Sequence, residues 1–238
     1  MKKLTFLFAL VALVMSGAAL YMSSPAGLEH TLVNHPRMLL NASSAVEQLL
    51  QEEAIAKQQE AARTAEAAIE ENIELFNNAE NDPFVGPNEA AATVVEFFDF
   101  SCGYCHALAP TLEKLVEANA DVKFVFKPLA FLSPASEYAA KAFVAANMQG
   151  KGYGFYKNVM AMSGLNEEKI NDAAKKAGVD LSKMKNDMES ETVEAVLRTN
   201  VDLAQKANIN GVPLLIINGK IMHTISPEEL QGAIDAAK

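Results

Sequence analysis

The stretch from Val94 to His106 reads Val-Val-Glu-Phe-Phe-Asp-Phe-Ser-Cys-Gly-Tyr-Cys-His. Its first half is apolar and rich in residues that favour β-strands. Cys102 and Cys105 follow, where a helix-compatible segment begins that runs to about Ala118. Residues three apart lie on the same side of a helix, so the two sulfur atoms are close enough to form a disulfide. The pattern predicts a strand that leads into a redox-active cysteine pair at the start of a helix.

The position of Cys102 at the beginning of the expected helix predicts that it is the reactive thiol. The first backbone N–H groups of a helix have no partner within the helix, and with the helix dipole they stabilise a negatively charged sulfur. Cys105 lies one turn further in, where we expect it to be more buried and to resolve a mixed disulfide. We expect no cofactor beyond this Cys102–Cys105 disulfide.

These two cysteines are the only ones in the chain, which limits the alternatives. A structural disulfide that closes so short a loop adds little stability, because the stabilisation grows with loop length. A structural zinc site needs about four ligands. The chain offers four histidines but no second paired motif. We therefore expect a redox pair and no metal site.

The composition bears on partners and location. The chain has 238 residues, enough for one domain and an appendage, and a net charge of −10, which argues against nucleic acid as a partner. Residues 1–26 begin with two lysines and continue with an apolar run from Leu4 to Met22. This pattern predicts an export signal that is either cleaved or kept as a membrane anchor. In either case we expect the rest of the chain to work outside the cytoplasm, where disulfides persist.

Residues 27–81 predict a helical extension followed by a linker. From Ala45 to Phe76 the chain is rich in Ala, Glu and Gln and has no Gly or Pro, which favours one long helix. Before it, Pro36 is expected to separate two short helices. Apolar groups at both ends flank a polar middle, so we expect residues 28–76 to hold copies together as a homodimer, or alternatively a trimer. A helix folded back onto its own domain stays open as the other interpretation.

Residues 82–238 predict a domain in which strands and helices alternate. After the first strand and the cysteine helix, a second strand is expected near 121–129 and a helical region at about 134–208. Asn218-Gly219 is typical of a two-residue hairpin turn, and Ser226 begins the last helix. The order β-α-β, helices, β-hairpin, α predicts an α/β thioredoxin fold with a helical insertion.

The chain resembles the DsbA family of periplasmic thiol–disulfide oxidoreductases, and within it the Com-type and ScsC-type members with an N-terminal oligomerisation extension. The resemblance covers about Leu28 to the C-terminus. It is most specific at Glu96-Phe-Phe-Asp-Phe-Ser-Cys-Gly-Tyr-Cys105 and at Gly211-Val-Pro213.

The resemblance implies a role for each residue of the site. Cys102 is expected to be the exposed nucleophile, Cys105 the resolving thiol, and Pro213 a cis-proline that faces the sulfurs. A cis bond before Pro213 turns the backbone of Val212 toward the cysteines, where its N–H and C=O bind an extended substrate like a strand. Without the resemblance, Pro213 is simply a proline that begins a strand.

Glu96 lies six residues before Cys102 in an otherwise apolar run, either on the solvent face or buried beneath the cysteines. In the family, a buried acid at this place shuttles protons to the resolving thiol, and the resemblance implies the same role for Glu96. Lys127, at the end of the second strand, is expected to be its partner.

The dipeptide Gly103-Tyr104 is expected to tune the redox couple and to meet the substrate. It resembles the pair found in DsbC and ScsC isomerase-type proteins, whereas Val212 before the proline resembles DsbA. The two signals conflict, so oxidase and isomerase both stay open. His106 is either a solvated helix residue or a modulator of the cysteine pair.

We expect the chain to form or isomerise disulfides in unfolded or wrongly bonded exported proteins. A membrane redox partner is expected to recycle the cysteine pair. Two alternatives belong to other classes: a non-catalytic exported chaperone or binding module, and a thiol reductase that serves metal tolerance.

Overall fold

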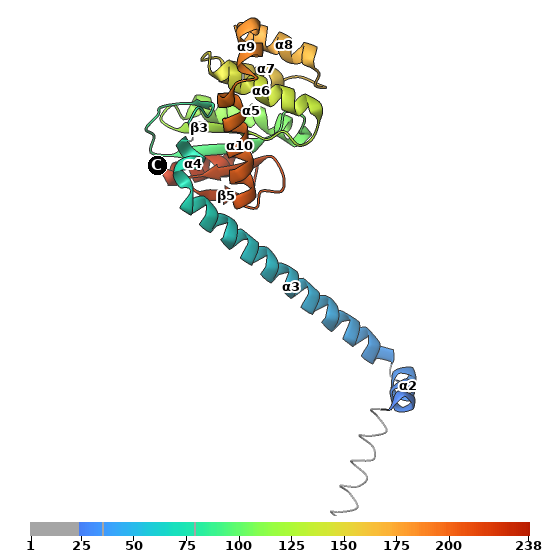
Figure 1. Ribbon diagram of the computed structural model, residues 1–238. Coiled ribbons are helices and arrows are strands. Elements are labelled where there is room, and N and C mark those ends of the chain that lie inside the picture. Colours follow the sequence, from blue (N-terminus) through green and yellow to red (C-terminus); the bar gives the residue numbers. More distant parts are fainter. Residues whose placement is uncertain (1–23, 35, 79) are drawn as a thin grey trace, which may run out of the picture. The chain divides into compact units, whose positions relative to one another are not determined.

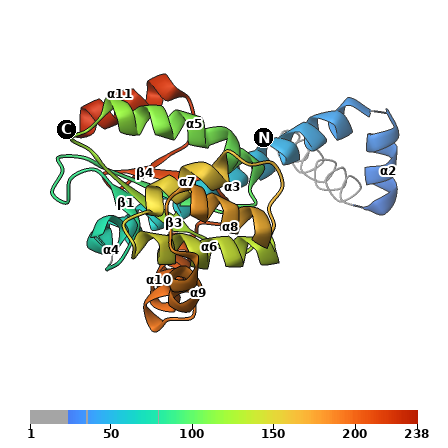
Figure 2. The same ribbon diagram turned by 90° about the horizontal axis from the view of Figure 1, so that it is seen from above.

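The computed structural model describes residues 24–238 except 35 and 79, and Figures 1 and 2 show it from two directions. Most of the predicted export signal therefore lies outside the described residues. Among the helices of the described part, none has the length and apolarity needed to cross a membrane. The chain divides into two compact units, one that ends at Glu60 and one that runs from Ala61 to Lys238. Each unit is described by itself.

The first unit is helical. It contains α2 (Pro25–Asn34) and most of α3 (Pro36–Glu71). The long helix thus begins at Pro36 and not at the predicted Ala45, and within residues 24–34 a single short helix precedes it. Proline is well suited to the first turn of a helix, because its missing N–H would have no helical partner there.

The second unit is built on a sheet of five strands in the described part of the chain, in the order β1-β3-β2-β4-β5. The central strand β2 (Thr93–Phe98) pairs in parallel with β3 (Lys123–Pro128) and antiparallel with β4 (Leu214–Ile217). Every residue of β2 and β3 is buried. This is the burial expected for strands that are covered on both faces, and it explains their near-continuous apolar sequence.

Of the two edge strands, one was predicted from the sequence and the other was not. β5 (Lys220–Met222) pairs with β4 across the predicted turn at Asn218-Gly219, where both residues have positive φ. β1 (Phe84–Val85) pairs antiparallel with β3 and was not predicted, because two residues inside a turn-rich segment carry no periodic signal.

The predicted helical insertion between β3 and β4 is confirmed. The helices that follow α3 in the described chain are α4 (Ile73–Asn78), α5 (Gly103–Ala118), α6 (Pro134–Asn147), α7 (Gly152–Met160), α8 (Glu167–Lys176), α9 (Leu181–Asp187), α10 (Glu191–Lys206) and α11 (Pro227–Ala237). In the insertion, α6, α8, α9 and α10 each begin after a Ser, Asn or Asp whose side chain accepts a hydrogen bond from the backbone of the first turn.

Side chains along β2 point alternately to the two faces of the sheet and pack into two separate apolar cores. Val94 and Phe98 face a core shared with α5, α11 and the insertion helices. Phe97 faces a second core on the other side of the sheet, together with Ile69 of α3, Phe76 of α4 and part of α10. Because Ile69 and Phe76 pack into this core, the second unit begins at Ala61 and not at the predicted residue 82.

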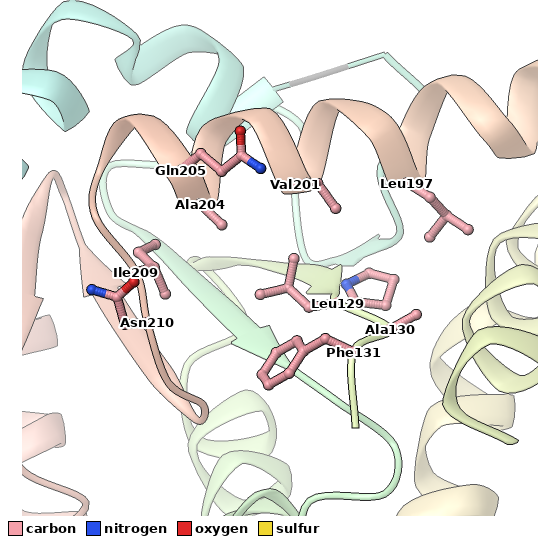
Figure 3. A pocket seen from close by; sticks show the side chains of 10 residues that line it. Leu129, Ala130, Phe131, Leu197, Val201, Ala204, Gln205, Ile209 and Asn210 are labelled. Atoms are coloured by element: carbon pink, nitrogen blue, oxygen red, sulfur yellow. The ribbon is translucent and has the colours of Figure 1, made fainter. Parts of the chain in front are cut away.

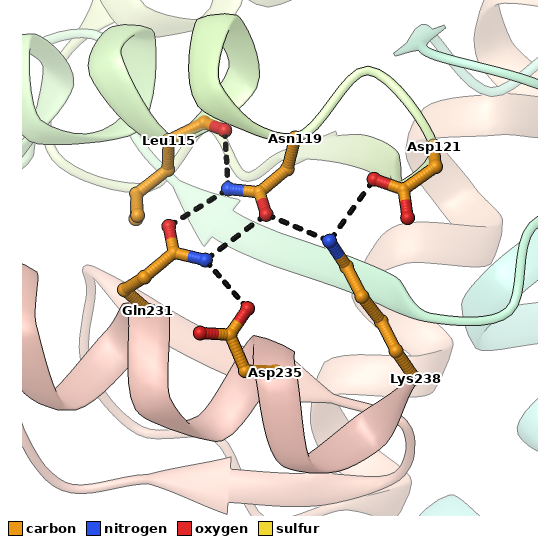
Figure 4. Close-up of polar contacts among 6 residues, drawn as sticks. All are labelled: Leu115, Asn119, Asp121, Gln231, Asp235 and Lys238. Carbon is orange, nitrogen blue, oxygen red and sulfur yellow. Dashed lines mark hydrogen bonds and ion pairs between the residues drawn. The ribbon is translucent and has the colours of Figure 1, made fainter.

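Helices α5 and α11 lie side by side in the view of Figure 2, and a polar network joins their ends (Figure 4). The amides of Asn119 and Gln231 exchange two hydrogen bonds, of 2.8 and 3.0 Å. Nζ of Lys238 donates to Oδ1 of Asn119 and to Oδ1 of Asp121, each at 3.0 Å. The network fixes the C-terminus of the chain to the far end of the helix that carries the cysteines.

Candidate active site

The two cysteines lie where the sequence placed them, at the start of α5. Cys102 is the N-cap residue, in an extended conformation, and its Sγ accepts a hydrogen bond from the backbone N–H of Cys105 at 3.4 Å. Cys102 is only 7% exposed, so it is buried and not exposed as the resemblance implied, and Cys105 is fully buried. Both are free thiols. The helix therefore offers a backbone donor to the outer sulfur and covers the inner one.

The predicted cis peptide bond between Val212 and Pro213 is present. It precedes β4, and Val212 lies close to the cysteines. The thiol of Cys102 is 3.4 Å from the carbonyl oxygen of Val212, with the thiol as donor. A segment of backbone just before β4 therefore touches the outer sulfur directly, which is what binding of an extended substrate beside the thiol requires.

Gly103 and Tyr104, between the cysteines, are both exposed, and Tyr104 keeps 75% of its surface accessible. A Cβ atom added to Gly103 would meet no other atom within 4 Å. No close packing requires glycine at this position. The dipeptide instead forms open surface next to Cys102.

Glu96 lies in the middle of β2 and is 2% exposed, so it is the buried acid of the two predicted arrangements. Its Oε2 accepts a hydrogen bond of 2.9 Å from the hydroxyl of Tyr156 on α7. Oε1 has no hydrogen-bond partner in the part of the chain that the structure describes. Burial raises the pKa of Glu96 to about 8, against the opposing effect of the Tyr156 hydrogen bond. At neutral pH the carboxyl group is therefore mostly protonated.

The inner thiol is also hard to ionise. Burial is the largest cause that raises the pKa of Cys105 above its ordinary value, and a negative charge on Glu96 raises it further. The two groups thus interact electrostatically, and each disfavours ionisation of the other. Such a pair can hold one negative charge more easily than two, which suits transfer of a proton between them.

The predicted partnership of Glu96 with Lys127 is wrong. Lys127 belongs to β3, at a position whose side chain points to the opposite face of the sheet from Glu96. There its ammonium group forms a buried ion pair with Asp82 and donates to the carbonyl oxygen of Leu75 at 3.0 Å. Residues on neighbouring strands share a face only when their registers match, and Phe126, not Lys127, is opposite Glu96.

His106 is half-buried, and none of its hydrogen bonds goes to a sulfur atom of the cysteine pair. Its Nε2 lies 2.7 Å from the carbonyl oxygen of Phe100 and its Nδ1 lies 2.8 Å from that of Met160. Carbonyl oxygens only accept, and a neutral imidazole has a single N–H, so both hydrogen bonds form together only in the imidazolium. His106 joins the end of α7 to the segment that precedes Cys102.

Asp99 is a buried residue of the site that the sequence analysis missed. Its Oδ1 accepts from the backbone N–H of Ser101 at 2.7 Å and from the hydroxyl of Ser136 at 2.5 Å. Its Oδ2 accepts from the backbone N–H groups of Phe131 and Leu132, each at 3.1 Å. Asp99 thus holds the turn before Cys102 to the segment between β3 and α6.

The sequence carries a signal for Asp99 but none for Tyr156. Asp99 is a second acidic residue within the apolar stretch before Cys102, and this pattern could have identified it as a residue of the site. Tyr156 has no local signal, because only the packing of α7 against β2 brings it to Glu96. In the part of the chain that is described, no group of three or more His, Cys, Asp or Glu gathers as a metal site would require.

Comparison with known proteins places the chain in a family. A family model described as Thioredoxin matches residues 77–236. A thioredoxin-like oxidoreductase from Silicibacter pomeroyi of known structure is 34% identical, with a TM-score of 0.65, over 69% of this chain and 96% of that one. The catalytic domain of Proteus mirabilis ScsC is 25% identical, with a TM-score of 0.66, over 72% of this chain and 97% of that one.

Among curated relatives, disulfide bond formation protein D of Bacillus subtilis is 26% identical over 167 residues, which are 64% of this chain and 75% of that protein. The chain belongs to the thioredoxin family, with the thiol–disulfide oxidoreductases of the DsbA and ScsC kind. It covers only 25% of the length of another relative, a Na(+)/H(+) antiporter NhaA 1 of Salinispora arenicola, at 28% identity.

Proposed function

We propose that the chain exchanges disulfides with exported proteins through Cys102 and Cys105. The observation that supports this most directly is the position of the Cys102 sulfur. It lies at the N-cap of α5, 3.4 Å from the backbone N–H of Cys105 and 3.4 Å from the carbonyl oxygen of Val212. The first turn of the helix points a backbone donor at this sulfur, and the adjacent backbone of Val212 holds the substrate beside it.

In the oxidising direction, a substrate thiolate attacks Sγ of Cys102 and breaks the Cys102–Cys105 bond. The sulfur of Cys105 leaves as a thiolate and is protonated, and a mixed disulfide joins the substrate to Cys102. A second substrate thiolate then attacks the substrate sulfur of the mixed disulfide. This step forms the substrate disulfide and releases Cys102 as a thiolate, so two electrons have moved to the chain.

Glu96 supplies the proton in the first of these steps. Its protonated carboxyl donates to the leaving Cys105 sulfur, and in the reverse direction its carboxylate takes the proton from Cys105. A pKa of about 8 leaves the carboxyl protonated at neutral pH but able to ionise. The hydrogen bond from Tyr156 orients the carboxyl, so Tyr156 is a positioning residue and does not contact the sulfurs by a hydrogen bond.

The substrates are unfolded or wrongly bonded proteins in the periplasm. The charged and apolar pattern of residues 1–26 supports export to that compartment. A protein that donates disulfides must be oxidised again after each turnover, and we assign this to a membrane redox partner. No further cofactor is required, because the cysteine pair itself carries the two electrons.

We also propose that the extension joins two copies of the chain, as a homodimer rather than a trimer. Large apolar side chains on α3 are exposed in the first unit, at Val46, Leu49 and Leu50. Their spacing places them along one side of the helix, and burial against a second copy would remove them from water. Paired sites hold a wrongly bonded substrate longer, which together with Gly103-Tyr104 favours isomerisation over oxidation alone.

Refolding assays with the whole chain test the proposal. The chain should oxidise reduced ribonuclease and rearrange scrambled ribonuclease, and Cys102→Ser should abolish both activities. Cys105→Ser should keep the reactive thiol and accumulate mixed disulfides. If Cys102→Ser assists refolding as well as the parent does, the chain is a binding module. Stoichiometric metal binding by the reduced chain, without activity on either ribonuclease, would favour the reductase that serves metal tolerance.

A further inference from the structure

An apolar groove of about 270 Å³ lies between α10 and the segment that follows β3 (Figure 3). Leu129 and Phe131 form one wall, and Val201 and Ala204 of α10 face them from the other. Ile209 closes the end nearest β4. Phe131 is 56% exposed and Val201 is 42% exposed, so large apolar side chains line a hollow that the chain itself does not fill.

One wall of the groove is connected to the thiol site through Asp99. The side chain of Asp99 accepts the backbone N–H groups of Phe131 and Leu132. Its backbone carbonyl accepts the N–H of Cys102 at 2.9 Å. The exposed apolar segment is therefore held by the same residue that holds the reactive cysteine, and Asp99 itself is fully buried.

The end of the groove is connected to the thiol site through the chain. Ile209 and Asn210 line the groove, and Val212 follows two residues after Asn210. The carbonyl oxygen of Val212 lies 3.4 Å from Sγ of Cys102. Two residues span at most roughly 7 Å even when the chain is extended, so a segment bound along Val212 passes close to the end of the groove.

We propose that this groove binds a bulky apolar side chain of the polypeptide whose cysteine reacts with Cys102. The inference deepens the proposed function, because it assigns a preference to the same site. Unfolded proteins expose Leu, Phe and Met that folded ones bury, so a subsite for such side chains selects unfolded substrates. The hydrogen bonds to Asp99 fix the wall in advance, so binding does not first have to order this segment.

The test measures how fast the oxidised full-length chain oxidises peptides that each carry two cysteines. Two electrons and two protons pass from the peptide thiols to the Cys102–Cys105 disulfide, and mass spectrometry follows the peptide disulfide. One residue of the peptide is Leu or Ser, and it is moved from one to five positions away from the nearer cysteine. Each rate is divided by the rate at which the same chain oxidises dithiothreitol, a dithiol too small to fill the groove.

For the parent chain we expect the Leu peptide to react about five to ten times faster than the Ser peptide at its best position. In Val201→Gln and in Phe131→Ala the ratio should fall to about two or less. Met148→Gln is the matched control, because Met148 is exposed but does not line the groove, and it should keep the parental ratio.

A parental ratio that survives in both groove variants would overturn the assignment of the groove. A parent without preference at any position would do the same, although exchange with dithiothreitol would leave the proposed function standing. A parent that fails to oxidise dithiothreitol would defeat the proposed function itself. If Val201→Gln changes the mass in light scattering but not the peptide ratio, the groove is a contact between copies and the assignment is wrong.

Discussion

The hydroxyl of Tyr156 donates a 2.9 Å hydrogen bond to Oε2 of Glu96, and both side chains are buried between β2 and α7. The donor favours the ionised carboxylate and so lowers the pKa of Glu96, although burial, the larger effect, keeps it near 8. Tyr156→Phe removes the donor and should raise the pKa of Glu96 by about one unit. Cys105 resolves a mixed disulfide at a rate that depends on pH, and the midpoint of this pH profile should move to higher pH by the same amount.

Tyr153→Phe is the matched control for this prediction. Tyr153 lies on the same helix and stacks with Tyr156 at a centroid distance of 6.2 Å, but it makes no hydrogen bond to Glu96. Its pH profile should match that of the parent. A carbon-13 NMR titration of the glutamate carboxyl groups gives an independent reading, and equal titration of Glu96 in both variants would contradict the proposed role of Tyr156.

The raised pKa of Glu96 makes the stability of the fold depend on pH. An unfolded chain holds this proton up to about 4.5, whereas the folded chain holds it up to about 8. Between these values the folded state binds more protons, so stability is lost as the pH rises. Glu96→Gln removes this titration. We expect the parent to lose on the order of 3 kcal/mol relative to the variant between pH 5 and pH 8.

Urea unfolding at several pH values measures this difference. Burial also raises the pKa of Asp82, but Asp82 is present in both proteins, so its contribution cancels from the comparison. Parallel stability curves for the parent and Glu96→Gln would show that Glu96 ionises in the folded chain at its ordinary value. The variant should also resolve mixed disulfides more slowly, because glutamine cannot exchange a proton with Cys105.

Breaking the ion pair of Lys127 and Asp82 should reduce the stability of the fold without reducing the reactivity of the cysteines. Burial lowers the pKa of Lys127 and raises that of Asp82, and the attraction between them opposes both shifts. Lys127→Met leaves Asp82 buried without its cation and should destabilise the fold by about 3 kcal/mol. Lys127→Met with Asp82→Leu should restore part of this, because both charges are then absent. Urea midpoints measure the effect.

The same variants test whether Lys127 influences the cysteines, which lie against the other face of the sheet. Lys127 lies on the face opposite Glu96, so alkylation of Cys102 by iodoacetamide should proceed at the parental rate in Lys127→Met. A tenfold slower reaction, roughly 1.4 kcal/mol, in a variant that remains folded would indicate that Lys127 acts on the thiols after all.

Local patterns in the sequence were sufficient for the cysteine pair and for most of the regular elements, although not for the short strand β1 or for the start of α3. Cys102 precedes a helix because a β-prone run ends in Ser101, and the caps at Ser133 and Ser226 mark two more helices. Contacts between distant elements carry no such local signal. Tyr156 meets Glu96 only through helix packing, and Lys127 was assigned to the wrong face because its register with β2 was unknown.

The boundary between the extension and the second unit shows the same limit. Composition places it in the turn-rich linker from Asn77 to Asn88, where Asn, Pro and Gly accumulate. Burial places it at Ala61, because Ile69 and Phe76 complete the core on one face of the sheet. Both residues are fully buried, and a helix composition without Gly or Pro does not reveal which of its turns will pack.

Two truncations therefore should behave differently. Removal of residues before Ala61 keeps Ile69, Phe76 and the partner of Lys127, so the second unit should unfold near the parental urea midpoint. Removal of residues before Asp82 deletes both apolar side chains and should destabilise the unit by roughly 3 kcal/mol or more. Equal midpoints for the two truncated proteins would contradict the role of these residues in the core.

The shorter truncation also tests the proposed dimer. Without the exposed apolar side chains of α3, the protein should be monomeric in light scattering and should still oxidise dithiothreitol at the parental rate. It should lose most of its activity on scrambled ribonuclease, since a single site releases the substrate before it is rearranged. Leu49→Glu with Leu50→Glu in the full chain is the matched variant, because it keeps every residue of the second unit. A monomeric parent, or a monomeric variant that isomerises as well as the parent, would show that the extension does not pair the sites.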